Sequence, residues 1–363
     1  MSVKIILVVV SLILSLAIGL TVAGISGTSA GGGGGNGRGA ADESRPVVIG
    51  LSLDTLKEER WQTDRDAFVA RAKELGAEVH VESANSDDAT QIQNVTGLLS
   101  RGVDVLVIVP HNAQAMARAV ELAHEQGVSV IAYDRLIRGC DLDLYLSFDN
   151  VRVGRVQAQF IVDRLPMPDG QPMKLVRIYG AKSDNNALLF KQGQDEVLQP
   201  YIDRGEIEIV QEDFADDWKP ENAKRITNAA LTKVGRELDA VLASNDGTAG
   251  GAIQALSEEG LAGDVIVTGQ DAELVACQRI AQGTQAMTVF KPLKLLADRC
   301  AELAVDFSRG KPLVANATTN NGMTDVPTVM MDVQIVTSDN LDVVVDAGMH
   351  SSEAIRGTPE AGE

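Results

Sequence analysis

Short apolar runs alternate with helical patterns from residue 46 onward. Residues 47–53 form an apolar run of the kind that is buried in a parallel sheet. Residues 59–75 then carry apolar side chains at helical spacing, and Gly76 follows as a helix stop. The pattern recurs in predicted strands at 77–83, 103–110 and 128–133, and in predicted helices at 87–101 and 113–126. Four strands joined by three crossovers predict one doubly wound α/β half.

A second series of the same kind begins at residue 143. Its predicted strands lie at 143–148, 173–179, 206–211, 238–244, 264–269 and 284–290. The helices predicted between them lie at 151–164, 185–203, 219–233, 248–260 and 272–282. A helix at 293–309 and a weaker strand pattern at 327–336 follow, before a polar tail at 348–363. We therefore expect an α/β fold with two doubly wound parallel-sheet lobes and a cleft between them.

The composition limits the chemistry that such a protein could perform. Of its 363 residues 45% are hydrophobic, which suits a globular chain of about two domains. The net charge of −19 repels phosphate backbones and anionic lipids, so no nucleic-acid partner is expected. Its three cysteines are far apart, and its four histidines show no metal-ligand spacing. Motifs of hydrolytic serines and phosphate loops are also missing from the sequence, so we expect no catalytic residues, no metal and no cofactor. We also expect a monomer.

The first 45 residues differ from the rest of the chain. Lys4 is followed by an uncharged, apolar run over 5–25, which is typical of an export signal. The small residues at 28–30 suit cleavage by a signal peptidase, whereas the length of the run also suits an uncleaved membrane anchor. We therefore expect residues 1–30 to be a signal peptide or an N-terminal anchor. Residues 31–45 are Gly-rich and are expected to be a flexible linker.

Polar side chains follow the predicted strands at the point where each strand ends. In an open parallel sheet ligands bind beyond these carboxyl ends. A second interpretation is that Asp and Asn at such positions are helix N-caps and turn formers. That interpretation does not explain why Arg, Lys and both tryptophans of the chain gather at the same edge. The residues at these positions are Asp54, Arg60, Trp61, His111, Asn112, Asp134, Arg135, Asp184, Asn185, Asn186, Asp216, Asp217, Trp218, Asn245, Asp246, Gln270, Asp271 and Lys291.

The two tryptophans suggest what kind of ligand this edge binds. Trp61 and Trp218 lie one in each predicted lobe, each among charged neighbours. Two aromatic faces can stack on the C–H faces of a sugar ring, while Asp, Asn, Arg and Lys pair with its hydroxyls. Asp134 and Asp271 could also act as an acid/base pair, but nothing in the sequence places them around a scissile bond. We therefore expect a carbohydrate-binding cleft.

The chain resembles the periplasmic sugar-binding proteins of ABC importers, in the ribose/galactose-type class, and within it those that bind D-xylose. The resemblance covers roughly residues 47–350. It is carried by residues 59–65 (ERWQTDR), 101–108 (RGVDVLVI), 132–135 (AYDR), 147–150 (SFDN), 184–187 (DNNA), 243–256 (ASNDGTAGGAIQAL) and 269–272 (GQDA). It implies that the sugar is held by Arg60, Trp61, Asp134, Arg135, Asp184, Asn186, Trp218, Asn245, Asp271 and Lys291.

The resemblance further implies a type I binding-protein fold with a hinge of three crossings, near residues 148–150, 289–292 and 325–327. The N-terminal lobe would comprise residues 46–148 and 292–325, and the C-terminal lobe residues 149–291 and 326–347. The implied partners are D-xylose and the permease and ATPase subunits of an importer. An exported location, in the periplasm or on the extracellular face, would follow.

Three other functions remain alternatives. A sugar sensor that presents its closed form to a membrane chemoreceptor or sensor kinase would have the same cleft. The sensing half of a transcriptional repressor would need a basic DNA-binding helix before residue 46, where the chain has an apolar run and glycines instead. An enzyme would need the catalytic constellations that the sequence lacks.

Overall fold

The computed structural model describes residues 45–165 and 170–357, and the expected signal or anchor and most of the expected linker lie outside them. The first lobe is built on a seven-stranded sheet of order β11-β12-β5-β4-β3-β1-β2, in which only β11 is antiparallel to its neighbour. Its strands are β1 (Val48–Leu53), β2 (Glu78–Ser83), β3 (Val105–Ile108), β4 (Ser129–Tyr133), β5 (Leu144–Phe148), β11 (Ala317–Asn320) and β12 (Asp325–Met331). Its helices are α2 (Glu59–Glu74), α3 (Asp88–Ser100), α4 (Ala117–Glu125) and α10 (Leu293–Ser308).

The second lobe contains a parallel sheet of order β7-β6-β8-β9 and a small antiparallel pair, β10-β13. The strands are β6 (Met173–Tyr179), β7 (Ile207–Phe214), β8 (Ala240–Ala243), β9 (Ile266–Val267), β10 (Thr288–Phe290) and β13 (Gln334–Val336). The helices are α5 (Asn150–Val162), α6 (Asn185–Asp203), α7 (Pro220–Val234), α8 (Asp246–Glu258), α9 (Leu274–Ala281), α11 (Asp342–Asp346) and α12 (Ser352–Arg356). The predicted α/β class with two parallel-sheet lobes is confirmed.

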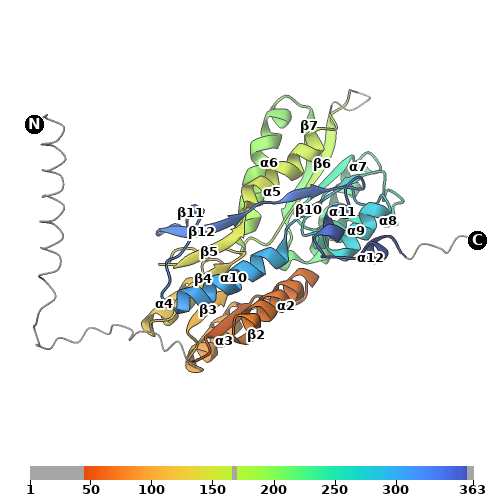
Figure 1. Ribbon diagram of the computed structural model, residues 1–363. Helices are drawn as coiled ribbons and strands as arrows, with labels where there is room; N and C mark the ends of the chain where they lie inside the picture. The colour runs from red at the N-terminus through yellow and green to blue at the C-terminus, as the bar shows by residue number, and fades with distance from the viewer. Residues whose placement is uncertain (1–44, 166–169, 358–363) are drawn as a thin grey trace, which may run out of the picture. The chain divides into compact units, whose positions relative to one another are not determined.

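Segments that are far apart in the sequence complete the first lobe. The helix α10 packs along α2, as Figure 1 shows in blue and orange. Both helices bury apolar side chains in one core with β1 and β4, among them Phe68, Leu296 and Ala301. The core of the first lobe therefore includes a helix that comes later in the sequence than every strand of the second lobe's parallel sheet.

In the second lobe α5 and α6 pack closely because each has a glycine at the contact. A Cβ on Gly154 would meet the backbone oxygen of Phe190 at 2.0 Å, and a Cβ on Gly193 would meet that of Val151 at 2.0 Å. This contact holds α6 along α5, and at the start of both helices Asn150 Nδ2 donates to Asn186 Oδ1 at 2.9 Å, which helps to position the N-terminus of α6.

The C-terminal segment corrects two expectations. The resemblance implies that the strand near 327–336 belongs to the second lobe, but β12 pairs in parallel with β5, with Thr328 opposite Tyr145 and Met331 opposite Phe148. The chain therefore leaves the first-lobe sheet between Met331 and Gln334 instead of near residues 325–327. A short strand carries no local signal for which of two sheets it joins, because its pairing partner lies far away in sequence. The expected polar tail contains α12, whose Ile355 is buried beside α9.

Candidate functional site

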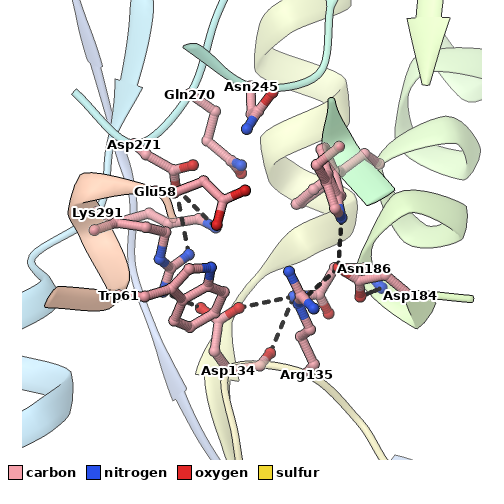
Figure 2. Close-up of a pocket in the computed structure, with 13 residues that line it drawn as sticks. Glu58, Trp61, Asp134, Arg135, Asp184, Asn186, Asn245, Gln270, Asp271 and Lys291 are labelled. Atoms are coloured by element: carbon pink, nitrogen blue, oxygen red, sulfur yellow. Dashed lines mark hydrogen bonds and ion pairs between the residues drawn. The ribbon is translucent and has the colours of Figure 1, made fainter. Parts of the chain in front are cut away.

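The strand ends of both lobes meet around one cavity. All ten residues predicted to bind the ligand line it, together with three more. Figure 2 labels ten of the thirteen, and their side chains gather around the cavity. The cavity measures about 30 Å³, which is room for about two water molecules. Its lining residues are Glu58, Arg60, Trp61, Asp134, Arg135, Asp184, Asn186, Phe190, Trp218, Asn245, Gln270, Asp271 and Lys291.

Arg60, in the first turn of α2, is an ion-pair partner of both lobes. Its Nη2 lies 2.8 Å from Asp134 Oδ2 in the first lobe, and its Nη1 lies 3.4 Å from Asp271 Oδ1 in the second. A third carboxylate, that of Asp64, lies 3.1 Å from Nη2 and accepts a hydrogen bond from the Tyr133 hydroxyl. The ammonium of Lys291 approaches Asp271 Oδ1 to 3.4 Å. The five charged groups and the Tyr133 hydroxyl are all buried, so a connected network of charges borders the cavity.

Arg135 also forms ion pairs with carboxylates of both lobes. Its Nη1 lies 2.7 Å from Asp54 Oδ2 of the first lobe, and its Nε lies 2.8 Å from Asp184 Oδ2 of the second. Asn186 adds a further bond between lobes, because its Nδ2 donates to Asp134 Oδ1 at 3.0 Å. Each arginine therefore contributes to holding the two lobes together.

The tryptophans bound the cavity in different ways. The guanidinium groups of Arg60 and Arg135 lie 4.0 and 4.9 Å from the centre of the Trp61 ring, as cation–π contacts. Trp218 donates from Nε1 to Asp184 Oδ2 at 3.1 Å and contacts Phe190 edge to face. Both rings are buried and belong to the core that borders the cavity.

Three lining residues have a left-handed backbone. The φ angles of Asp134, Trp218 and Asp271 are 62°, 57° and 96°. Residues other than glycine rarely adopt such angles, and the strain that they carry clusters at ligand sites. The turns that aim these three side chains into the cavity are therefore held by the surrounding structure.

Two of the predicted residues are also helix caps. Asp184 caps α6 by accepting from Asn186 N at 2.8 Å, and Asn245 caps α8 by accepting from Thr248 N at 2.9 Å. The capping and the ligand-binding interpretations are therefore compatible. Asp246, by contrast, is turned away from the cavity and accepts from Glu273 N, Gln285 Nε2 and Thr288 Oγ1.

The carboxyl groups of the site differ in their pKa. Burial opposes ionisation of Asp134, but the charges of Arg60 and Lys291 outweigh it and lower its pKa. Burial raises the pKa of Asp184, although Arg135 acts in the opposite direction. Asp134 is therefore ionised at neutral pH, and its carboxylate can only accept hydrogen bonds.

No group of three or more His, Cys, Asp or Glu side chains in 45–165 and 170–357 is arranged to hold a metal ion. Within the same ranges no helix has the length and apolar character needed to span a bilayer.

Comparison with known proteins identifies the family. A family model described as "Periplasmic binding protein domain" matches residues 49–312. The chain belongs to the periplasmic binding protein family. It is 46% identical to the D-xylose-binding periplasmic protein of Escherichia coli (strain K12), over 87% of this chain and 94% of that protein. It is also 46% identical to the D-xylose-binding periplasmic protein of Haemophilus influenzae, over 86% and 93%.

A solved structure of the same kind supports the fold assignment. A carbohydrate transporter solute-binding protein from Chloroflexus aurantiacus, in complex with D-glucose, is 35% identical and superposes with a TM-score of 0.79. The match covers 86% of this chain and 98% of that one. The arrangement of two parallel-sheet lobes is therefore that of a periplasmic binding protein.

Three lining residues of this binding protein were not predicted as site residues. Gln270 lies three residues beyond the end of β9 and belongs to the wider set of strand-end residues, but not to the ten residues predicted to bind the ligand. Glu58 lies between Lys57 and Glu59, and a run of charged residues at this point predicts a solvent-exposed start of a helix. Phe190 lies on an apolar face of α6, and its position in the sequence therefore predicts a core residue. Of the three, only Gln270 is marked in the sequence by its position at a strand end.

Proposed function

We propose that this protein captures a monosaccharide, D-xylose, between its lobes and delivers it to the permease of an ABC importer. The observation that carries the proposal is the set of ten cavity residues from both lobes, in a chain 46% identical to two D-xylose-binding proteins. Carboxylates, amides, guanidinium groups and two indole rings match the hydroxyls and C–H faces of a pyranose.

Sugar entry exchanges contacts between the lobes for contacts with the sugar. The cavity of about 30 Å³ is too small for a sugar ring, so the hinge must open for the ligand to enter. The bound sugar then replaces part of the bonds that Arg60 and Asn186 make to Asp134 and Asp271. Contacts from both lobes favour the closed form, which the membrane partner recognises.

We propose binding without turnover. If Asp134 and Asp271 were a glycosidase pair, one of the two would need to be a carboxylic acid with a raised pKa. The Arg60 and Lys291 charges lower the pKa of Asp134 against the effect of burial, and both Asp134 and Asp271 are ion-paired with Arg60. These contacts suit acceptors of hydroxyl hydrogen bonds.

Calorimetry against a panel of pentoses and hexoses tests the ligand. D-xylose should bind with a dissociation constant at or below the micromolar range, about −8 kcal/mol or better. If D-glucose or D-ribose binds more tightly, the xylose assignment is wrong. If no monosaccharide binds, the proposal as a whole is wrong.

We place the protein outside the cytoplasm, with the permease and ATPase subunits as its partners. Deleting its gene should abolish uptake of labelled xylose at micromolar concentration. If uptake persists and only a behavioural or transcriptional response to xylose is lost, the protein serves a sensor instead of an importer. Fractionation of cells, with sequencing of the mature N-terminus, distinguishes a cleaved signal over residues 1–30 from an anchor.

A further inference from the structure

Two acceptor oxygens in the cavity wall have no hydrogen-bond partner among the described residues. One is Oε1 of Gln270, whose side chain is almost completely buried, with 2% of the residue exposed. The other is Oε2 of Glu58, an atom that is itself buried. Figure 2 shows the two side chains reaching toward each other inside the cavity. Glu58 precedes α2 in the first lobe and Gln270 follows β9 in the second.

Glu58 is unlike the other carboxylates that line the cavity, because within residues 45–165 and 170–357 one of its oxygens has no partner and no cationic nitrogen is paired with it. Asp134, Asp184 and Asp271 are each within 3.4 Å of a cationic nitrogen. The charges that act on Glu58 are those of Arg135, Asp54 and Lys57, and none of them bonds to its Oε2. A buried acceptor without a donor costs free energy, and most such atoms in folded proteins have a partner.

The position of the two oxygens indicates where a donor comes from. Both line the cavity that the proposed function assigns to the sugar. A carboxylate oxygen and an amide oxygen can only accept, so the ligand must donate to them. A vicinal pair of ring hydroxyls supplies two donors side by side, one for each oxygen.

We propose that Glu58 and Gln270 are two further sugar-binding residues, which accept hydrogen bonds from adjacent hydroxyls of the ligand. The proposal rests on the proposed function and specifies that this side of the cavity selects ligands with two adjacent hydroxyl groups. Sugars that are deoxygenated or O-methylated at these ring positions leave an acceptor without a donor and bind weakly. Because the two residues belong to different lobes, the pair also favours the closed form.

Calorimetry on the full chain tests the pair, with D-xylose and each of its monodeoxy analogues as ligands. Glu58→Met and Gln270→Met remove the acceptors and keep side chains of similar length. We expect Glu58→Met to weaken xylose binding about 10- to 100-fold and Gln270→Met about 5-fold, because bonds to a charged acceptor are stronger. The matched control is Glu59→Met, since Glu59 is the exposed neighbour in sequence and does not line the cavity.

The deoxy analogues separate a ligand contact from a structural role. The wild-type protein should discriminate against the two analogues that lack the facing hydroxyls, and each variant should lose the discrimination at one position. The melting temperature of the unliganded Glu58→Met protein should change little, because Oε2 has no partner in the described part of the chain and the only hydrogen bond that acts on the carboxylate there comes from the backbone of Glu58 itself. Equal affinity of both variants and wild type overturns the proposal. An equal loss on every analogue with a lower melting temperature also overturns it, whereas a wild type that binds no monosaccharide refutes the proposed function.

Discussion

The ring of Trp218 lies against the backbone of Gly180. A Cβ on Gly180 would come within 2.0 Å of Cη2 and 2.1 Å of Cζ2 of that ring. The indole therefore occupies the space that any other residue at position 180 would need. In this position it faces the cavity and donates to Asp184.

We expect Gly180→Ala to displace the Trp218 ring and weaken sugar binding by about 1–3 kcal/mol, because the added methyl cannot fit without a shift. Calorimetry and the fluorescence of Trp218 measure the effect. Gly97→Ala is the control, since a Cβ on Gly97 has no neighbour within 4 Å. Unchanged affinity and emission in Gly180→Ala would mean that the ring position is not needed for binding.

Arg60→Met should destabilise the unliganded protein by about 3–5 kcal/mol, since it leaves buried carboxylates without their guanidinium partner. The carboxylates are those of Asp64, Asp134 and Asp271. Denaturant unfolding measures the change. Arg152→Met is the control, because the Arg152–Asp332 pair is exposed and should contribute less than about 1 kcal/mol. Similar losses in the two variants would contradict the importance of the buried network.

The stability of the unliganded protein should fall as the pH rises from about 5 to 9. Burial, with the charges of Asp246, Asp271 and Glu59, raises the pKa of Glu273 to about 8, while Arg279 acts in the opposite direction. A carboxyl group with a raised pKa in the folded state binds more protons there than in the unfolded state. Its stabilising effect is therefore present at low pH and is lost as the pH rises through the folded pKa.

Melting temperatures over this range test the effect. Glu273→Gln should flatten the dependence, and Glu221→Gln, at an exposed position on α7, should leave it unchanged. A steeper fall in Glu273→Gln than in the wild type would contradict the assignment.

The three cysteines should be inert in the native protein. All are buried and free, and burial raises the pKa of the thiols of Cys140 and Cys277 to about 12 and that of Cys300 further. Thiolates are the reactive form, so a disulfide reagent such as DTNB should titrate no thiol in the native state and three after unfolding. Rapid reaction of any thiol in the native protein would show that the buried state opens easily.

Local patterns predicted the fold well where each element has its own signal. The alternation of apolar runs and helical spacing gave both lobes, because burial on both faces of a parallel strand is visible in sequence. The assignment of β12 failed, since its pairing with β5 is decided about 180 residues away by which sheet edge is open.

The ten predicted cavity residues were found because strand ends in a parallel sheet converge on one edge. Their assignment to a sugar came from the resemblance to a known family as well as from the two tryptophans. Glu58 was missed because its exposure depends on how α2 begins beside the second lobe. Glu58 stands in a run of four charged residues, 57–60, and nothing in that run reveals that one of its carboxylate oxygens is buried.

The pairing of β12 with β5 also affects the order in which the protein can be completed during synthesis. A nascent chain that ends before residue 317 lacks both β11 and β12, so one edge of β5 stays open while the parallel sheet of the second lobe is already present. An open edge strand is a site for mispairing with other chains. The first lobe is thus synthesised first, but its sheet is completed only after the parallel sheet of the second lobe. A truncation within residues 317–331 should therefore be more prone to aggregate than a loss of the final residues.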